Sequence, residues 1–558
     1  MYETLISFSK EVIPEADFFM DSNTLYNEEK GYGFVIERNR KEYEYLQIAE
    51  VNSAFSVWYW DEGNEITKLI DTPLGVSVDG NELVPLIFKL KVPFQGNYQV
   101  VLTISADAFG CDNIYVFTGR RRLAAKGVSI LPNSNITLHL NVNVCDIIPR
   151  GLENRYEDKT IDITLLGNHV SITALTVKEV KTPTIYIAGD STVTDQKGNY
   201  PYNPGCCFAG WGQMLSAFLN PDIAISNHAH SGLTTKSFRD EGHYDIVQSY
   251  MKTGDYLLIQ FGHNDQKLPE LKAFDGYRKR LMQYIDETEK IGAFPIMITP
   301  LARNTWKADG TYNDLLAEYA EECIRIGKER QIPVIDLHGF SMDFIMGEGL
   351  ENAKQYFYPK DYTHTNDYGA YVMARYIVSE FAQMDILKAY VKKNSLVDWK
   401  PTTTIVLPKR PEGFEMIASK LPDESNLERP DDLIIRVEFI DLLIKAVGFV
   451  PMNVYNDMYL DVIGHEWYAG VVEASYLNSL VNDKYTSEGR FRPLEPVSSE
   501  QMVSFVANGY RSRKITSFKV HDTTLLRQLH IVDDNYQATK LITRREALSV
   551  LKKLENVL

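Results

Sequence analysis

Residues 184–392 alternate short apolar runs with longer amphipathic stretches, and this alternation restricts the fold more than any other feature of the chain. The runs TIYIAG, DYLLIQFG and FPIMITP have the length and composition of buried strands, whereas YRKRLMQYIDETEKIG and LLAEYAEECIRIGKERQ have helical patterns. Strands that alternate with helices form a parallel sheet. We therefore predict an α/β domain over residues 181–392.

Two different patterns flank this segment. Residues 1–180 contain short alternating or β-branched runs separated by Gly, Asn, Asp and Pro clusters, which predicts a jelly-roll-like β-sandwich. Residues 393–430 contain five prolines and several charges, which is typical of an extended linker. Residues 431–558 favour a small α-helical domain, and a length of 558 residues agrees with about three domains.

Aromatic residues near the middle of the predicted sandwich have two interpretations. They could form a platform on which a sugar stacks, as in a carbohydrate-binding domain, but packing in the core explains them better. These residues are Phe55, Trp58, Tyr59 and Trp60.

A serine follows the first strand-like run of the α/β segment. Ser191 stands in the sequence GDST, where a strand that turns into a helix would expose the hydroxyl group at the carboxyl end of the sheet. Serine needs a base to become a nucleophile, and histidine has a suitable pKa. His364 stands near the end of the segment, and Asp361, three residues before it, can orient its ring. We predict a catalytic triad of Ser191, His364 and Asp361.

Two further blocks can supply donors to a developing oxyanion. Gly232 ends the sequence SNHAHSG, and its backbone N–H can approach a substrate oxygen because no side chain intervenes. Asn264 follows the run DYLLIQFG, and its side-chain amide can donate to the same oxygen. With the backbone N–H of Ser191, these groups form the predicted oxyanion hole.

The four blocks together resemble the SGNH, or GDSL, hydrolase superfamily, which is named for a Ser, Gly, Asn and His in this chain order. The resemblance implies a flavodoxin-like parallel sheet and an acyl-enzyme mechanism in which Ser191 attacks, His364 transfers protons and no metal or cofactor takes part. The segments GWGQML, NHAHSG, IQFGHNDQ and DYTHTNDYGA resemble the rhamnogalacturonan acetylesterase branch. Leu233 and Thr234 depart from the Gly-Arg-Ser continuation that is usual there.

That closer resemblance implies an acetylesterase that acts on pectin-derived, rhamnogalacturonan-type saccharides. Two alternatives stay open. The first is an SGNH esterase with another acyl substrate, such as acetylated xylan, a lipid or a thioester. The second is a non-catalytic protein that binds carbohydrate or the cell wall.

The C-terminal region resembles degenerate S-layer homology repeats. Only TRRE, at 543–546, matches the start of a repeat helix well. The resemblance implies contact with cell-wall polysaccharide as an alternative role for residues 431–558.

Other charged and metal-binding groups have weaker interpretations. Arg303 stands where a loop could meet an acidic sugar, although an ion pair within the loop explains it equally well. A zinc site is a further alternative, since residues spaced as HxH on a strand face the same side, but no matching carboxylate or cysteine set accompanies them. The histidines concerned are His228, His230, His243 and His263.

Charge and cysteine content limit the partners and the location. The formal charge of −17 argues against binding of nucleic acid or of anionic membranes, because like charges repel. No run approaches the roughly 20 apolar residues of a membrane-spanning helix. The first residues lack the features of a secretion signal, and five cysteines without a CxxC pair fit reduced thiols. We expect a cytoplasmic protein, with the cell surface as the alternative.

Overall fold

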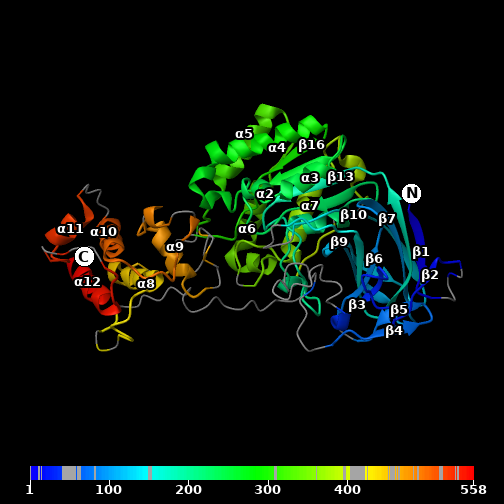
Figure 1. Ribbon diagram of the computed structural model, residues 1–558, viewed down its shortest axis with the longest axis horizontal. Helices are drawn as coiled ribbons and strands as arrows, with labels where there is room; N and C mark the ends of the chain where they lie inside the picture. The colour runs from blue at the N-terminus through cyan, green and yellow to red at the C-terminus, as the bar shows by residue number, and fades with distance from the viewer. Residues whose placement is uncertain are drawn as a thin grey trace.

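The chain folds into three parts that follow one another in sequence (Figure 1). Strands dominate the first part, strands and helices alternate in the second, and helices form the third. The computed structural model describes residues 2–9, 13, 15–39, 58, 65–80, 83–148, 154–306, 311–359, 361–393, 397–401, 421–423, 425, 427–449, 451–452, 459, 461–462, 466–481, 483–486, 489–514, 520–533, 536 and 540–558.

The first part consists of two β-sheets that share one hydrophobic core. One has seven strands, with β10-β7-β12-β1-β2 as its main path, and the other has the order β3-β6-β11-β8-β9. Alternate residues point into the core, as Val100 and Leu102 do from one sheet and Phe88 and Leu90 from the other. The strands are β1 (Glu3–Ser7), β2 (Phe18–Phe19), β3 (Tyr32–Val35), β4 (Leu69–Thr72), β5 (Gly75–Val78), β6 (Leu86–Lys91), β7 (Gly96–Ala106), β8 (Cys111–Thr118), β9 (Arg122–Ile130), β10 (Asn135–Val144), β11 (Thr160–Leu166) and β12 (Val170–Val180). We refer to this part as the sandwich; its jelly-roll class stays a prediction.

The second part contains the parallel sheet that the sequence predicts. Its order is β14-β13-β15-β16-β17, and each neighbouring pair is parallel. The strands are β13 (Thr184–Gly189), β14 (Ala224–Asn227), β15 (Tyr256–Gln260), β16 (Phe294–Ile298) and β17 (Val334–Ile335). All five strands therefore end at the same edge of the sheet, and this confirms the predicted α/β arrangement.

Helices cover both faces of this sheet (Figure 1). Ile185 and Ile187 of β13 join the core formed with α6 and α7, whereas Tyr186 and Ala188 join the core formed with α3, α4 and α5. Because both faces are covered, the strand is apolar throughout rather than alternating. The helices are α2 (Ser237–Asp240), α3 (His243–Tyr250), α4 (Arg278–Ile291), α5 (Ala317–Arg330), α6 (Leu337–Ala353) and α7 (Asp367–Phe381).

The third part is a set of helices with a core of its own. Thr543 caps the last helix, since its side chain accepts from the N–H of Glu546 while the Glu546 carboxylate accepts from the N–H of Thr543. The S-layer resemblance of these residues stays a prediction. The helices are α8 (Arg436–Val447), α9 (Ala469–Leu477), α10 (Ser499–Lys514), α11 (Asp522–Gln528) and α12 (Arg544–Val557).

A buried arginine joins the sandwich to the α/β part. Arg121 lies in the turn between β8 and β9, and its side chain is fully buried. The guanidinium donates to the carboxylate of Asp367 at 2.6 Å, to the carbonyl of Phe208 at 2.7 Å and to the carbonyl of Gln196 at 3.1 Å. Tyr202 donates to the same Asp367 oxygen at 2.7 Å. The two parts thus share an ion pair that water does not reach.

Trp58 contributes to the same junction. Its indole is fully buried and packs edge-on against Phe117 of the sandwich and Tyr202 of the α/β part. Trp58 therefore packs in the core, whereas Phe55, Tyr59 and Trp60 lie outside the described residues.

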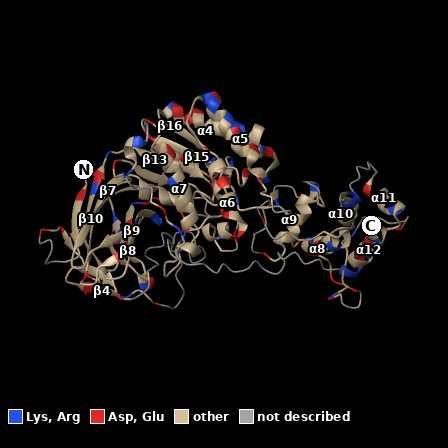
Figure 2. Cartoon of the chain, turned by 180° about the vertical axis from the view of Figure 1, so that it is seen from behind, with Lys and Arg blue, Asp and Glu red and all other residues tan. Residues whose placement is uncertain are grey.

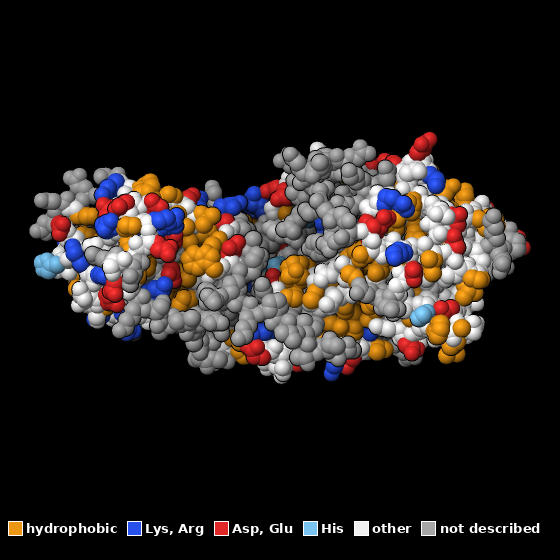
Figure 3. Space-filling view, turned by 90° about the horizontal axis from the view of Figure 1, so that it is seen from below, with side chains coloured by type: hydrophobic (Ala, Val, Ile, Leu, Met, Phe, Trp, Pro, Cys, Tyr) orange, Lys and Arg blue, Asp and Glu red, His pale blue; other side chains and the backbone are white. Residues whose placement is uncertain are grey.

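Charged residues of both signs are interspersed along the outer helices α4 and α5 (Figure 2). Ion pairs join these helices, as between Arg330 and Asp286 at 2.5 Å and between Arg278 and Glu322 at 2.6 Å. On the face that Figure 3 presents, hydrophobic side chains form separate groups among charged ones. No described helix is both long enough and apolar enough to cross a lipid bilayer.

Candidate active site

The structure brings Ser191, His364 and Asp361 together in one hydrogen-bonded chain. The Oγ atom of Ser191 lies 2.8 Å from Nε2 of His364, and Nδ1 of that ring lies 2.8 Å from Oδ2 of Asp361. An ionised carboxylate only accepts hydrogen bonds, so Nδ1 carries the proton. Nε2 is therefore left as the acceptor that faces the serine hydroxyl.

The loop before α7 fixes the carboxylate of Asp361. Its Oδ1 atom accepts the backbone N–H groups of Thr363 at 2.7 Å and of His364 at 2.9 Å. Burial by itself would raise the pKa of Asp361, but the charge of His364 and these hydrogen bonds outweigh it and hold the pKa below its usual value. Asp361 therefore stays ionised and can stabilise an imidazolium.

Gly232 and Asn264 lie on neighbouring loops at the same edge. Gly232 has a φ of +87°, with open space where a side chain would stand, so no side chain covers the backbone at this position. The Asn264 amide nitrogen donates to the carbonyl of Leu233 at 3.0 Å. Asp265 also accepts the backbone N–H of Thr235 at 2.9 Å, which ties the two loops together.

A buried polar network beneath Ser191 was not predicted. Asp190 accepts from Thr192 at 2.8 Å, Thr192 accepts from Gln260 at 2.8 Å, and Gln260 accepts from the indole of Trp211 at 2.7 Å. The other oxygen of Asp190 lies 3.3 Å from Nδ1 of His263. These residues stand in the GDST, GWGQ and QFGHND blocks. Their place in these blocks is the only feature of the sequence that could have pointed to the network.

This network holds the turn that presents Ser191. Burial would raise the pKa of Asp190, but the charge of His263 and the hydrogen bonds to it lower the pKa overall. Gly189 is needed at the end of β13, because a Cβ atom there would lie 2.8 Å from Val193 and 2.9 Å from the Gln260 carbonyl. The glycine thus permits the tight strand-to-serine turn.

Two aromatic rings flank the base. The Phe208 ring is perpendicular to the His364 imidazole with centroids 5.8 Å apart, and it stacks on Tyr358. Both side chains are half-buried. They therefore present apolar surface beside His364.

The four histidines of the zinc alternative do not form a metal-binding set, although the ring centroids of His230 and His243 lie 5.1 Å apart. His228 and His230 follow the end of β14, so they are not on one strand face as the HxH spacing predicted. Within the described ranges, no group of three or more His, Cys, Asp or Glu side chains has a metal-binding arrangement. His263 pairs with Asp190 and not with a metal-ligand set.

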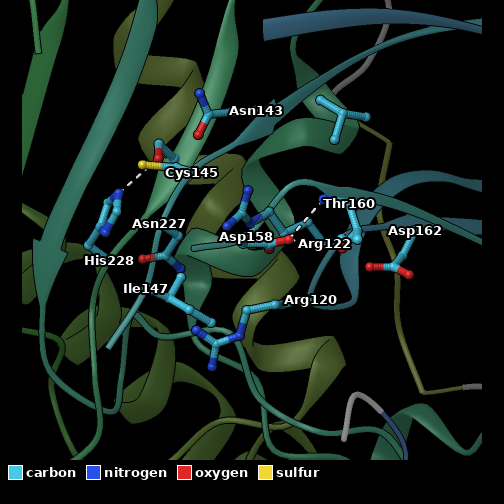
Figure 4. A pocket seen from close by; sticks show the side chains of 13 residues that line it. Arg120, Arg122, Asn143, Cys145, Ile147, Asp158, Thr160, Asp162, Asn227 and His228 are labelled. Carbon is cyan, nitrogen blue, oxygen red and sulfur yellow. Dashed lines mark hydrogen bonds between the residues drawn. The ribbon is translucent and has the colours of Figure 1, made fainter. Parts of the chain in front are cut away.

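His228 lies instead in a pocket between β14 and the sandwich, and Ser191 is not among the residues that line it (Figure 4). Its Nε2 atom is 2.9 Å from the Ser226 hydroxyl. Burial, with the nearby charge of Arg122, lowers the pKa of His228 to about 3. The ring is therefore neutral at neutral pH.

Replacing His228 with asparagine is expected to change how stability depends on pH. Below pH 6.5 the unfolded chain protonates this histidine while the folded protein does not, so falling pH costs the wild type about 1.4 kcal/mol per pH unit at this residue. Asparagine does not titrate. Urea unfolding at pH 7, 5.5 and 4.5 measures the free energy of unfolding. As the pH falls, the value for His228→Asn should rise relative to the value for wild type. A difference that is constant across this range would contradict the assignment.

The structure places Arg303 against the loop that carries His263. Its side chain is buried, and the guanidinium donates to the His263 carbonyl at 3.2 Å. It thus supports the loop that carries Asn264 from behind.

Comparison with known proteins identifies a family and several relatives. The model of the GDSL-like lipase/acylhydrolase family matches residues 185–377. Over 215 residues, 36% of this chain and 90% of the relative, the chain is 31% identical to the rhamnogalacturonan acetylesterase RhgT of Bacillus subtilis (strain 168). It is 31% identical to the probable rhamnogalacturonan acetylesterase YesY of the same organism, over 36% of this chain and 94% of YesY.

A third relative covers more of the chain. The uncharacterized esterase YxiM of Bacillus subtilis is 24% identical over 376 residues, which are 65% of this chain and 86% of YxiM. The chain belongs to the GDSL, or SGNH, family of lipases and acylhydrolases, and it is a serine carboxylic-ester hydrolase.

Proposed function

We propose that this esterase removes acetyl groups from pectin-derived, rhamnogalacturonan-type saccharides. The hydrogen-bonded chain from Ser191 through His364 to Asp361 carries the catalytic part of the proposal. The two relatives named as rhamnogalacturonan acetylesterases support the acetylated saccharide as substrate. The stacked Phe208 and Tyr358 favour a sugar further, since an apolar ring face packs well on aromatic surface.

In the first half of the reaction, Oγ of Ser191 attacks the acetyl carbon while Nε2 of His364 takes the hydroxyl proton. The carbonyl oxygen becomes an oxyanion, and the N–H groups of Ser191, Gly232 and Asn264 are placed to stabilise it. The C–O bond to the sugar then breaks, and the sugar oxygen receives the proton from His364. Acetyl-Ser191 remains.

In the second half, a water molecule gives a proton to Nε2 of His364 and its oxygen attacks the acetyl carbon. The second tetrahedral intermediate collapses, Ser191 recovers its proton from His364, and acetate leaves. Asp361 stabilises the imidazolium in both halves without itself being protonated. His364 thus mediates every proton transfer that the cycle needs, between Ser191, the sugar oxygen and water, while Asp361 orients and stabilises its ring.

The test is a substrate panel. Acetate release should be fastest from acetylated rhamnogalacturonan oligosaccharides, slower from acetylated xylo-oligosaccharides, and slow from long-chain p-nitrophenyl esters and acyl thioesters. Ser191→Ala should abolish release while saccharide binding, measured calorimetrically, persists. If the xylan, lipid or thioester substrate is turned over faster, the proposed substrate is wrong and that compound class takes its place. Release that survives in Ser191→Ala would remove the proposed nucleophile.

The remaining assignments are also proposals. We propose domains at 1–180, 181–392 and 431–558, with a linker at 393–430, and carbohydrate binding as the role of the first. The strand orders of the two sheets in the sandwich support its jelly-roll class. We propose the cytoplasm as the location, and detection of the native protein on the cell surface by fractionation would support instead a wall-binding role for the C-terminal helices.

A further inference from the structure

A lysine is buried behind the proposed oxyanion hole. Lys267 ends the short 3-10 turn Asp265–Lys267, and only 8% of its surface is exposed. Lysine is almost never buried without a polar partner. The ammonium of Lys267 donates to Oδ1 of Asn264 at 3.2 Å.

This contact acts with the bond to Leu233 to set which way the Asn264 amide faces. The ammonium has only donors, so it requires the oxygen of the amide on its side. The amide nitrogen then lies on the other side, where one of its hydrogens bonds the Leu233 carbonyl at 3.0 Å. The second hydrogen is left for a substrate oxygen. A flipped amide would place N–H groups against the ammonium, which is unfavourable.

The setting strengthens the effect of the charge. Gly489, from the third part of the chain, lies against the loop, and a Cβ atom there would be 2.7 Å from the Lys267 carbonyl and 3.1 Å from Leu268. Electrostatic interactions grow as water is excluded, because the local dielectric constant falls. A positive charge behind the amide oxygen polarises the amide and makes its N–H groups better donors.

We propose that Lys267 is a positioning residue for ester hydrolysis, acting through Asn264. Its ammonium fixes the orientation of the Asn264 amide and adds positive potential where the oxyanion forms. This inference rests on the proposed role of Asn264 as an oxyanion donor.

The test is a double-mutant cycle on the full-length enzyme. Lys267→Met keeps the length of the side chain and removes the charge, and it should lower kcat by about 10- to 100-fold with KM changed less than about 3-fold. Asn264→Ala should lower kcat by about 100- to 1,000-fold. In the Asn264→Ala background, Lys267→Met should have almost no further effect, because its target is gone.

Controls separate this effect from general damage. Lys272→Met removes an exposed lysine from the same loop and should leave kcat unchanged. Lys267→Gln keeps a hydrogen-bond donor without the charge, so it should retain the melting temperature and give a kcat between wild type and Lys267→Met. If Lys267→Met unfolds, the cycle is measured with Lys267→Gln.

The outcomes distinguish the two proposals. Wild-type kcat in Asn264→Ala would overturn the proposed oxyanion hole. A strong loss in Asn264→Ala combined with wild-type kcat in Lys267→Met would overturn the inference about Lys267 alone. An equal loss from Lys267→Met in both backgrounds would also overturn it, because the lysine would then act independently of Asn264.

Discussion

His364→Ala is expected to lower kcat for acetyl-ester hydrolysis by roughly 10⁴- to 10⁶-fold while the protein stays folded. The imidazole is the only base within 2.8 Å of the Ser191 hydroxyl among the described residues. Without it the hydroxyl keeps its proton and attacks poorly. Its partial exposure means that an alanine leaves no large buried cavity. Initial rates and a thermal melt measure the two quantities.

The matched control is the double variant Ser191→Ala/His364→Ala. Residues that act as one unit lose their effect together, so the double variant should be about as slow as either single variant. Multiplicative losses would mean that the serine and the histidine act in different steps. If His364→Ala keeps more than about a tenth of wild-type kcat, His364 is not the base in the mechanism.

Arg121→Met is expected to destabilise the protein by about 3–5 kcal/mol. The Asp367 carboxylate would stay buried without its counter-charge, and the carbonyls of Phe208 and Gln196 would lose a donor. Burial already raises the pKa of Asp367 against the opposing effect of Arg121. Urea unfolding followed by fluorescence measures the loss of free energy.

Two comparisons make that prediction specific. Lys178→Met breaks the exposed ion pair with Glu3 and should cost less than about 1 kcal/mol. Arg121→Met/Asp367→Leu removes both buried charges and should recover a substantial share of the stability that Arg121→Met loses. A loss of less than about 1 kcal/mol in Arg121→Met would show that the junction does not depend on this ion pair.

The sequence predicts those features that depend on residues close together in the chain. Strand β13 is apolar throughout because both of its faces are covered, and this run beside helical patterns predicted the parallel sheet. Asp361 and His364 are three residues apart, so one loop can place both, and only the approach of Ser191 needed the fold.

Long-range partners could not be predicted in this way. The pairing of Asp190 with His263 joins residues 73 positions apart, and neither block shows which polar neighbour the other requires. Arg121 stands in a run of three arginines, and only the docked surfaces show that it is the fully buried one. Lys267 lies three residues from Asn264, and only the folded loop shows that its ammonium meets the amide oxygen.

The ion pair of Arg121 with Asp367 also limits how this gene can be divided. The family match covers residues 185–377, yet Asp367 and Tyr202 complete their bonding with a side chain contributed from outside that range. A polypeptide trimmed to residues 185–377 would keep the hydrogen bond from Tyr202 to Asp367 but would lose the counter-charge of Arg121. A chimera in which another domain replaces the sandwich must therefore supply a guanidinium at the position of Arg121.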